Sequence, residues 1–103
     1  MGMDEHGEAI LTSTPDVYRI SPLNPVTEGH MLFVHRDHFV RAEDGGYAST
    51  QTLEALLCWA KERRQDYNII QSNGSDATQT IQHVHFHFVP RRKGDGIALP
   101  WDR

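Results

Sequence analysis

The chain has 103 residues, 38% of them hydrophobic, which suffices for one domain with one modest core. Its formal net charge of −4 argues against a general nucleic-acid-binding surface, because duplex affinity depends on clustered cations. No apolar run is long enough to cross a bilayer, the acidic N-terminus lacks a signal-peptide hydrophobic region, and the single cysteine, Cys58, excludes an internal disulfide. We therefore expect one domain over residues 1–103 in a reducing, cytoplasmic compartment, without a nucleic-acid or membrane partner.

Three strands are predicted in the first third of the chain. Residues 1–8 are polar and acidic without periodicity, and such a terminal segment is expected to be flexible. The turn sequence Thr14-Pro15-Asp16 separates two short segments with β-branched residues, which predicts a hairpin. Two prolines and a glycine then indicate a loop that leads into an apolar strand. The predicted elements are strands over 9–12, 17–20 and 30–35, with a loop over 21–29.

One main helix is predicted in the middle of the chain. The segment 36–48 is polar and glycine-rich, so we expect a connection there. From Ser49 or Thr50 to near Asp66, apolar residues recur at helical spacing and charged residues occupy the opposite side. The expected core face of this helix consists of Leu53, Leu56, Leu57 and Ala60.

Two further strands are predicted in the last third of the chain. Aromatic and β-branched residues over 67–71 favour a strand, and the small polar residues over 72–77 favour a turn. The segment 79–91 is expected to return as an antiparallel partner, followed by a C-terminal tail over 93–103. This order of elements predicts an α+β fold, with an antiparallel sheet of about five strands and one helix.

The segment 79–91 carries three alternating histidines. His83, His85 and His87 are separated by single apolar residues. Because successive side chains of a strand point to opposite faces, all three imidazoles are expected to line one face. Such a face has two possible chemistries: converging imidazoles bind a transition metal, or one imidazole acts as a nucleophile while its neighbours bind an anionic substrate.

Three separated blocks in this chain resemble motifs of the histidine triad (HIT) family of nucleotide hydrolases and transferases. The similarity extends from about residue 17 to residue 91, although the N-terminal part is shorter than usual and looks minimal. Three blocks in one order are more specific than any single motif. The blocks are Glu28-Gly29-His30 with His38, then Asn73-Gly74 with Gln79-Thr80-Ile81, then His83-x-His85-x-His87 with Pro90-Arg91.

The resemblance implies a HIT-like fold and cleavage at the α-phosphate of a nucleoside phosphoramidate, phosphoanhydride or dinucleoside polyphosphate. It also implies a nucleotidyl-histidine intermediate, no metal or other cofactor, a purine nucleotide as substrate and a homodimer. His85 would be the nucleophile, and His87 would contact the phosphate or the bridging atom. The remaining implied site residues are His83 and His30, which would orient the nucleophile, and Gln79, Thr80, Asn24, Asn73 and Gly74, which would bind the substrate.

The chain also departs from the family pattern. Thr78 stands where the family usually has glycine, and Pro22 stands where many members place Asp or Asn for the ribose, with Asn24 near enough to substitute. These departures motivate an alternative function, a nucleotide-binding module with little or no turnover. The cluster Arg91-Arg92-Lys93 either steers an anionic substrate or is a solvated strand end.

Overall fold

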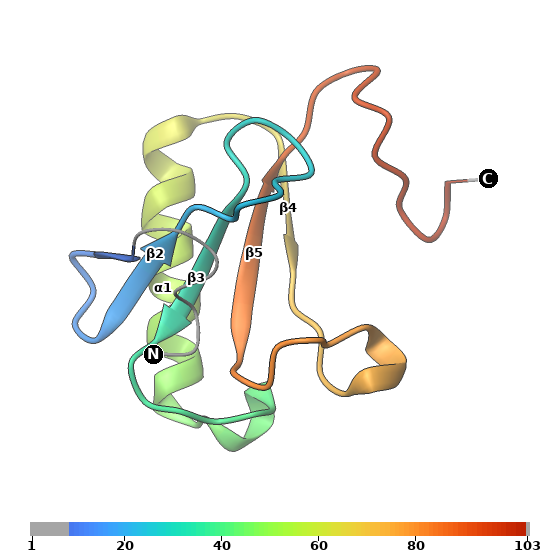
Figure 1. Ribbon diagram of the computed structural model, residues 1–103. Helices are drawn as coiled ribbons and strands as arrows, with labels where there is room; N and C mark the ends of the chain where they lie inside the picture. The colour runs from blue at the N-terminus through green and yellow to red at the C-terminus, as the bar shows by residue number, and fades with distance from the viewer. Residues whose placement is uncertain (1–8, 103) are drawn as a thin grey trace.

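The computed structural model describes residues 9–102 and contains one five-stranded antiparallel sheet (Figure 1). The strand order is β1-β2-β3-β5-β4. The single α-helix packs on one face of the sheet and contacts β3 most extensively. The predicted α+β fold, with about five strands and one main helix, is confirmed. The elements are β1 Ala9–Leu11, β2 Val17–Ile20, β3 Met31–His35, η2 Ala42–Asp44, α1 Tyr47–Arg63, β4 Tyr67–Ile70, η3 Ser75–Ala77 and β5 His85–Pro90.

The two faces of the sheet carry different sets of side chains. Alternation along β3 turns Phe33 towards α1, and turns Leu32 and Val34 to the other face. Burying a phenylalanine such as Phe33 or Phe88, both almost inaccessible, stabilises the fold by about 1.5–3 kcal/mol. The main core therefore lies between α1 and the sheet, and it consists of Val17, Phe33, Ala55, Leu56, Ala60, Val84, Phe86 and Phe88.

The helix begins earlier than predicted, at Tyr47, and ends at Arg63 instead of near Asp66. Its buried face consists of Thr52, Ala55, Leu56 and Ala60, which confirms Leu56 and Ala60 as core residues. Leu53 packs against the core while partly buried, whereas the prediction was wrong for Leu57, which is 44% exposed. Contacts with the sheet decide which part of the apolar side of the helix is buried. Trp59 packs edge-on against Phe33, with 6.4 Å between the ring centroids.

The strand that carries the histidines is shorter than predicted. It begins at His85, and residues 79–84 form no regular element. Within this irregular segment, the backbone N–H of Val84 donates to the carbonyl of Phe39 at 2.9 Å, in the connection that follows β3. His83 therefore lies outside the strand, and strand alternation does not determine its direction.

The C-terminal tail lies apart from the sheet core. Residues 91–102 form no helix or strand, and Figure 1 shows this tail extending away from β5. Residues 1–8, for which we expected flexibility, lie outside the described residues, and Arg103 lies outside them too. None of the helices within residues 9–102 is long and apolar enough to span a membrane.

Candidate functional site

A cavity of about 420 Å³ opens on the sheet face opposite α1. Neighbouring strands supply its floor: Leu32 of β3 and Ile70 of β4 flank His87 of β5 in register. The loop between β2 and β3 and the turn before β5 supply its walls. The lining residues are Pro22, Asn24, Val26, His30, Leu32, Ile70, Ser72, Thr78, Gln79, Thr80, Ile81, His85, His87 and Val89.

The structure brings six of the nine sequence-predicted site residues together at this cavity. They are Asn24, His30, Gln79, Thr80, His85 and His87. The other three, His83, Asn73 and Gly74, do not line it. Sequence reasoning did not identify Val26 or Ser72 as lining residues. Nothing in the residue types marks them, because loop geometry alone brings these side chains to the cavity.

A hydrogen bond decides which ring nitrogen of His85 carries the proton. Its Nδ1 lies 2.9 Å from the carbonyl oxygen of His83. A carbonyl oxygen only accepts, so Nδ1 carries the proton and donates it to this bond. In the neutral ring the lone pair is then on Nε2. His85 is 8% exposed and is the first residue of β5, so its backbone is held by the sheet.

In His87 the proton is on the other ring nitrogen, because His30 donates a hydrogen bond to Nδ1 of His87. The backbone N–H of Val26 donates to Nδ1 of His30 at 3.2 Å, so the proton of the neutral His30 ring is on Nε2. That Nε2 lies 2.9 Å from Nδ1 of His87 and donates to it. The neutral His87 ring therefore carries its own proton on Nε2. The two rings, which both line the cavity, therefore differ in the nitrogen that carries the proton, Nδ1 in His85 and Nε2 in His87.

His83 is buried and does not line the cavity. Its Nε2 donates to the carbonyl of His35 at 2.9 Å, and its ring lies edge-on to that of His38, with 4.9 Å between centroids. Its own carbonyl accepts the proton of His85, so His83 acts on the site through its backbone. The expected convergence of three imidazoles is therefore found for His85 and His87 but not for His83. Among residues 9–102, no three His, Cys, Asp or Glu side chains are grouped so that they could hold a metal ion.

Gln79 is buried and links two segments at the edge of the cavity. Its Oε1 accepts the backbone N–H of Gly74 at 2.8 Å, and its Nε2 donates to the carbonyl of Val40 at 2.7 Å. The side chain of Asn73 is bonded to Gln71 and to the backbone N–H of Ala42. Asn73 and Gly74 therefore support the turn that carries Gln79.

Thr78 has a backbone conformation that glycine adopts without strain, with φ 67° and ψ 26°. For a residue with a β-carbon this region costs about 1–2 kcal/mol, more than the extra backbone entropy of glycine. We expect Thr78→Gly to raise the free energy of unfolding by about 0.5–1 kcal/mol, measured by urea denaturation. Thr80, which has no positive φ, is the matched control, and Thr80→Gly should destabilise. A Thr78→Gly variant less stable than the wild type would contradict this account.

The stability of the fold is expected to depend on pH through two buried histidines. Burial lowers the pKa of His30. Burial also lowers the pKa of His83, and this effect outweighs the hydrogen bond to the carbonyl of His35, which raises that pKa. Below about pH 6.5 the unfolded chain therefore binds protons that the native chain excludes, and the free energy of unfolding falls by at most about 1.4 kcal/mol per pH unit for each histidine.

Urea denaturation between about pH 7.5 and pH 5.5 measures this slope, and a His30→Asn variant should show a shallower one. The pKa of the Asp95 carboxylate is also lowered, mainly by a hydrogen bond from Arg91, but it titrates below this window. Equal free energies of unfolding at the two ends of the range would contradict the prediction.

Comparisons with known proteins show the family and the fold of this chain. A family model described as HIT domain matches residues 4–94. The chain is 32% identical over 94 residues to an adenosine 5'-monophosphoramidase of Saccharomyces cerevisiae, covering 88% of this chain and 60% of that protein. It is 35% identical over 85 residues to an uncharacterized HIT-like protein of Methanocaldococcus jannaschii, covering 75% of this chain and 64% of that protein. The chain thus spans about three fifths of the length of these relatives.

A solved structure shows the same fold. The histidine triad nucleotide-binding protein from Candida albicans superposes with a TM-score of 0.75 at 22% sequence identity. The superposition covers 92% of this chain and 75% of the other. The likeness at this identity concerns the arrangement of helix and strands.

Proposed function

The chain belongs to the HIT family, and on that premise we propose that it is a nucleotide hydrolase or nucleotidyl transferase acting at the α-phosphate. The substrate class is a nucleoside phosphoramidate, phosphoanhydride or dinucleoside polyphosphate, with a purine base. One observation carries the proposal: Nδ1 of His85 donates to the carbonyl of His83, so the lone pair of the neutral ring is on Nε2.

The proposed reaction has two displacements at phosphorus. Nε2 of His85 forms a bond to the α-phosphorus, and the bond to the leaving group breaks with its electron pair. Water or another acceptor then attacks the phosphorus, and the pair returns to Nε2. In the hydrolytic case, one water molecule supplies the hydroxyl on phosphorus and the proton on the leaving group. The Nε2–H of His87 donates a hydrogen bond to the phosphate or the bridging atom, where negative charge develops.

The other predicted residues receive more specific roles. The hydroxyl of Thr80 and the backbone N–H groups of its turn would hold nonbridging oxygens, since both ends of the Gln79 amide are already bonded within the protein. Asn24 lines the same cavity as Pro22 and would contact the sugar. His83 would orient the nucleophile through its carbonyl, and His30 would orient His87.

The alternative is a nucleotide-binding module with little turnover, motivated by Thr78 and Pro22 at positions where the family pattern differs. A substrate panel separates the two: adenosine phosphoramidate, adenylyl sulfate and diadenosine triphosphate are incubated with the protein, and release of AMP is measured. Catalytic release of AMP from at least one compound supports the enzyme. Binding of AMP by calorimetry, with no release from any compound, supports the binding module.

We also propose a two-fold homodimer, as the family resemblance implies. The outer side of α1 and the edge strand β4 carry exposed apolar side chains, among them Leu57 at 44% and Ile69 at 39% exposure. Association would remove this surface from water. Sedimentation at micromolar concentration tests the proposal, and a monomer there would contradict it.

A further inference from the structure

The loop between β2 and β3 forms one wall of the cavity without belonging to a helix or strand. Its residues Pro22, Asn24 and Val26 line the cavity. A backbone bond from the N–H of His30 to the carbonyl of Thr27, at 3.2 Å, closes the end of the loop. A wall of this kind needs bonds to the rest of the fold to keep its shape, because the loop has no ladder of strand hydrogen bonds.

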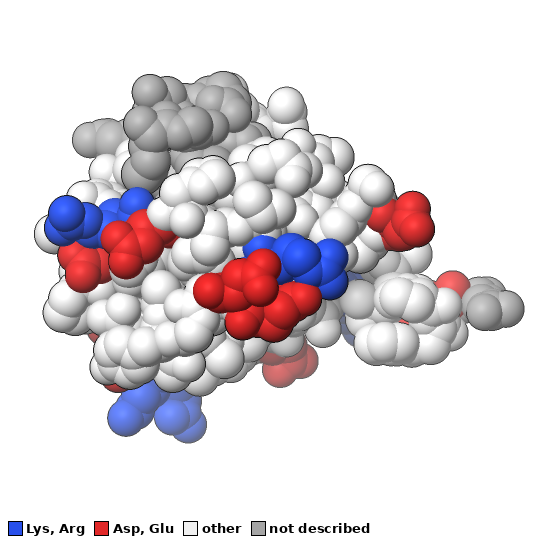
Figure 2. All heavy atoms as spheres, turned by 90° about the horizontal axis from the view of Figure 1, so that it is seen from below, with Lys and Arg blue, Asp and Glu red and all other residues white. Residues whose placement is uncertain are grey.

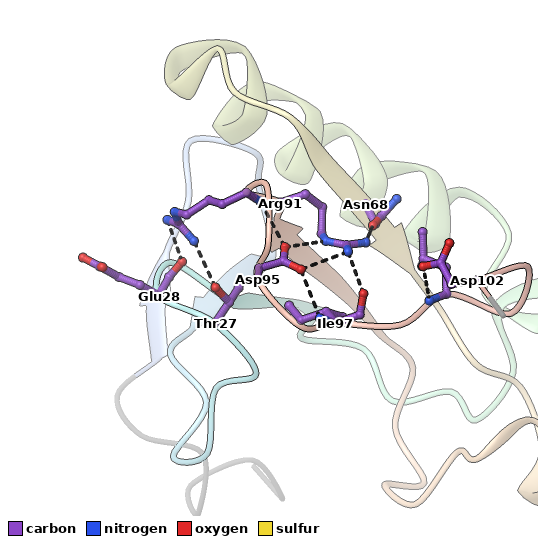
Figure 3. A network of polar contacts seen from close by, with 9 residues as sticks. Thr27, Glu28, Asn68, Arg91, Asp95, Ile97 and Asp102 are labelled. Carbon is purple, nitrogen blue, oxygen red and sulfur yellow. Dashed lines mark hydrogen bonds and ion pairs between the residues drawn. The ribbon is translucent and has the colours of Figure 1, made fainter.

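Arg92, just beyond the end of β5, provides such bonds. Its Nη1 donates to the hydroxyl of Thr27 at 2.9 Å, and its Nη2 donates to the carbonyl of Glu28 at 3.1 Å. Figure 3 shows Thr27 and Glu28 with the dashed lines that reach them. Among residues 9–102, no carboxylate is paired with the Arg92 side chain, so the guanidinium is engaged with the two neutral oxygens of the loop. A charged donor strengthens such bonds.

The backbone of Arg92 is itself anchored. Its N–H donates to Oδ2 of Asp95 at 3.0 Å. The Asp95 carboxylate also accepts from Nε of Arg91 at 2.9 Å and from the N–H of Ile97 at 3.0 Å (Figure 3). Arg91 donates further to the side chain of Asn68 at 2.6 Å. The two neighbouring arginines therefore bind different parts of the fold. Arg91 connects the turn at residues 92–95 to β4, and the side chain of Arg92 connects the same turn to the cavity loop.

The loop is also bonded to the reactive side chains. The N–H of Val26 donates to Nδ1 of His30, and Nε2 of His30 donates to Nδ1 of His87. The position of the Val26 amide thus decides which nitrogen of His30 carries the proton, and through it which nitrogen of His87 does. A displaced loop would change both the shape of the cavity wall and the proton arrangement of the two imidazoles.

We propose that Arg92 is a positioning residue that acts through the loop at 21–30 on nucleotide binding and on the tautomer of His30. This inference rests on the proposed function as far as the ligand is concerned. Arg92 does not line the cavity, and the hydrogen bonds to Thr27 and Glu28 carry its effect. The cluster at 91–93 therefore has a role that neither a steering patch nor a solvated strand end describes.

The test compares Arg92→Ala with Arg92→Lys and with Lys93→Ala, an exposed neighbouring cation, as the matched control. Loss of both bonds in Arg92→Ala should raise the KM for adenosine phosphoramidate about three- to ten-fold, a larger factor than the decrease in kcat. Lysine reaches the same oxygens with a single ammonium group and should recover part of the loss. Lys93→Ala should leave the KM at the wild-type value.

Two spectroscopic readouts test the loop independently of turnover. In Arg92→Ala, hydrogen exchange of the Val26 amide should accelerate, and the ¹⁵N shifts of His30 should move towards a mixture of tautomers. An unchanged KM together with unchanged Val26 exchange and His30 shifts would overturn the inference. If the wild type neither turns over nor binds any nucleotide, the proposed function fails. The Val26 and His30 readouts then still decide whether Arg92 holds the loop.

Discussion

Replacing His85 with asparagine is expected to lower kcat for adenosine phosphoramidate by about a thousand-fold or more, with little change in stability. Asparagine places an amide nitrogen near the position of the imidazole Nδ1, so it can still donate to the carbonyl of His83. It has no atom equivalent to Nε2, the nitrogen that would attack phosphorus. The substitution therefore removes the nucleophile and retains the hydrogen bond that holds the side chain.

The experiment measures steady-state turnover and thermal unfolding on the same preparations. Lys93→Ala is the control, because Lys93 is exposed and does not line the cavity. Its turnover should equal that of the wild type within a factor of about two. Turnover by His85→Asn at the wild-type rate would eliminate the covalent mechanism. A folded His85→Asn protein that still binds AMP but releases none from its substrates would support it.

Replacing Gln79 with alanine is expected to lower the free energy of unfolding by about 2–4 kcal/mol. Gln79 is 4% exposed, and its side chain satisfies the N–H of Gly74 and the carbonyl of Val40 at once. Alanine leaves both of these backbone groups without the partner that Gln79 provides. Each unsatisfied group costs about 1–3 kcal/mol.

This prediction distinguishes two roles of Gln79. A residue that only bound phosphate would weaken nucleotide affinity when it was replaced, and urea denaturation would show no loss of stability. Gln82→Ala is the control, because Gln82 is exposed and follows three residues later in the same irregular segment. Its free energy of unfolding should change by no more than about 0.5 kcal/mol. Equal stability of Gln79→Ala and Gln82→Ala would show that the two bonds of Gln79 contribute nothing.

Charge patterns in a sequence are ambiguous because the fold can place acidic side chains beside basic ones. On the face shown in Figure 2, which is seen from below the view of Figure 1, acidic and basic side chains lie next to one another. Arg91 pairs with Asp95, and Arg36 pairs with Asp16, which precedes it by 20 residues. A run of cations at 91–93 predicts an anion-binding patch only if nothing else in the fold engages it. The side-chain partners of Arg92, Thr27 and Glu28, lie more than 60 residues away in the chain, so the residues beside Arg92 in the sequence do not reveal them.

The local pattern of residues was sufficient for the element order and for part of the site. β-branched and aromatic segments, glycine and proline loops, and one helical period predicted five strands and a helix in the observed order. Alternation also predicted that His85 and His87 share a face, since both lie inside β5. These features depend on backbone geometry within a few residues, which the sequence determines.

Tertiary contacts decided the rest. His83 turns away from the cavity because the strand begins only at residue 85, and the carbonyl of His35, from β3, holds its ring. Leu57 is exposed because the sheet contacts the side of α1 that carries Ala55, Leu56 and Ala60. The proton position on His87 follows from a bond to His30, 57 residues away in the chain. Hydrogen-bond partners that meet only in the folded chain set these features, and residue types alone do not contain them.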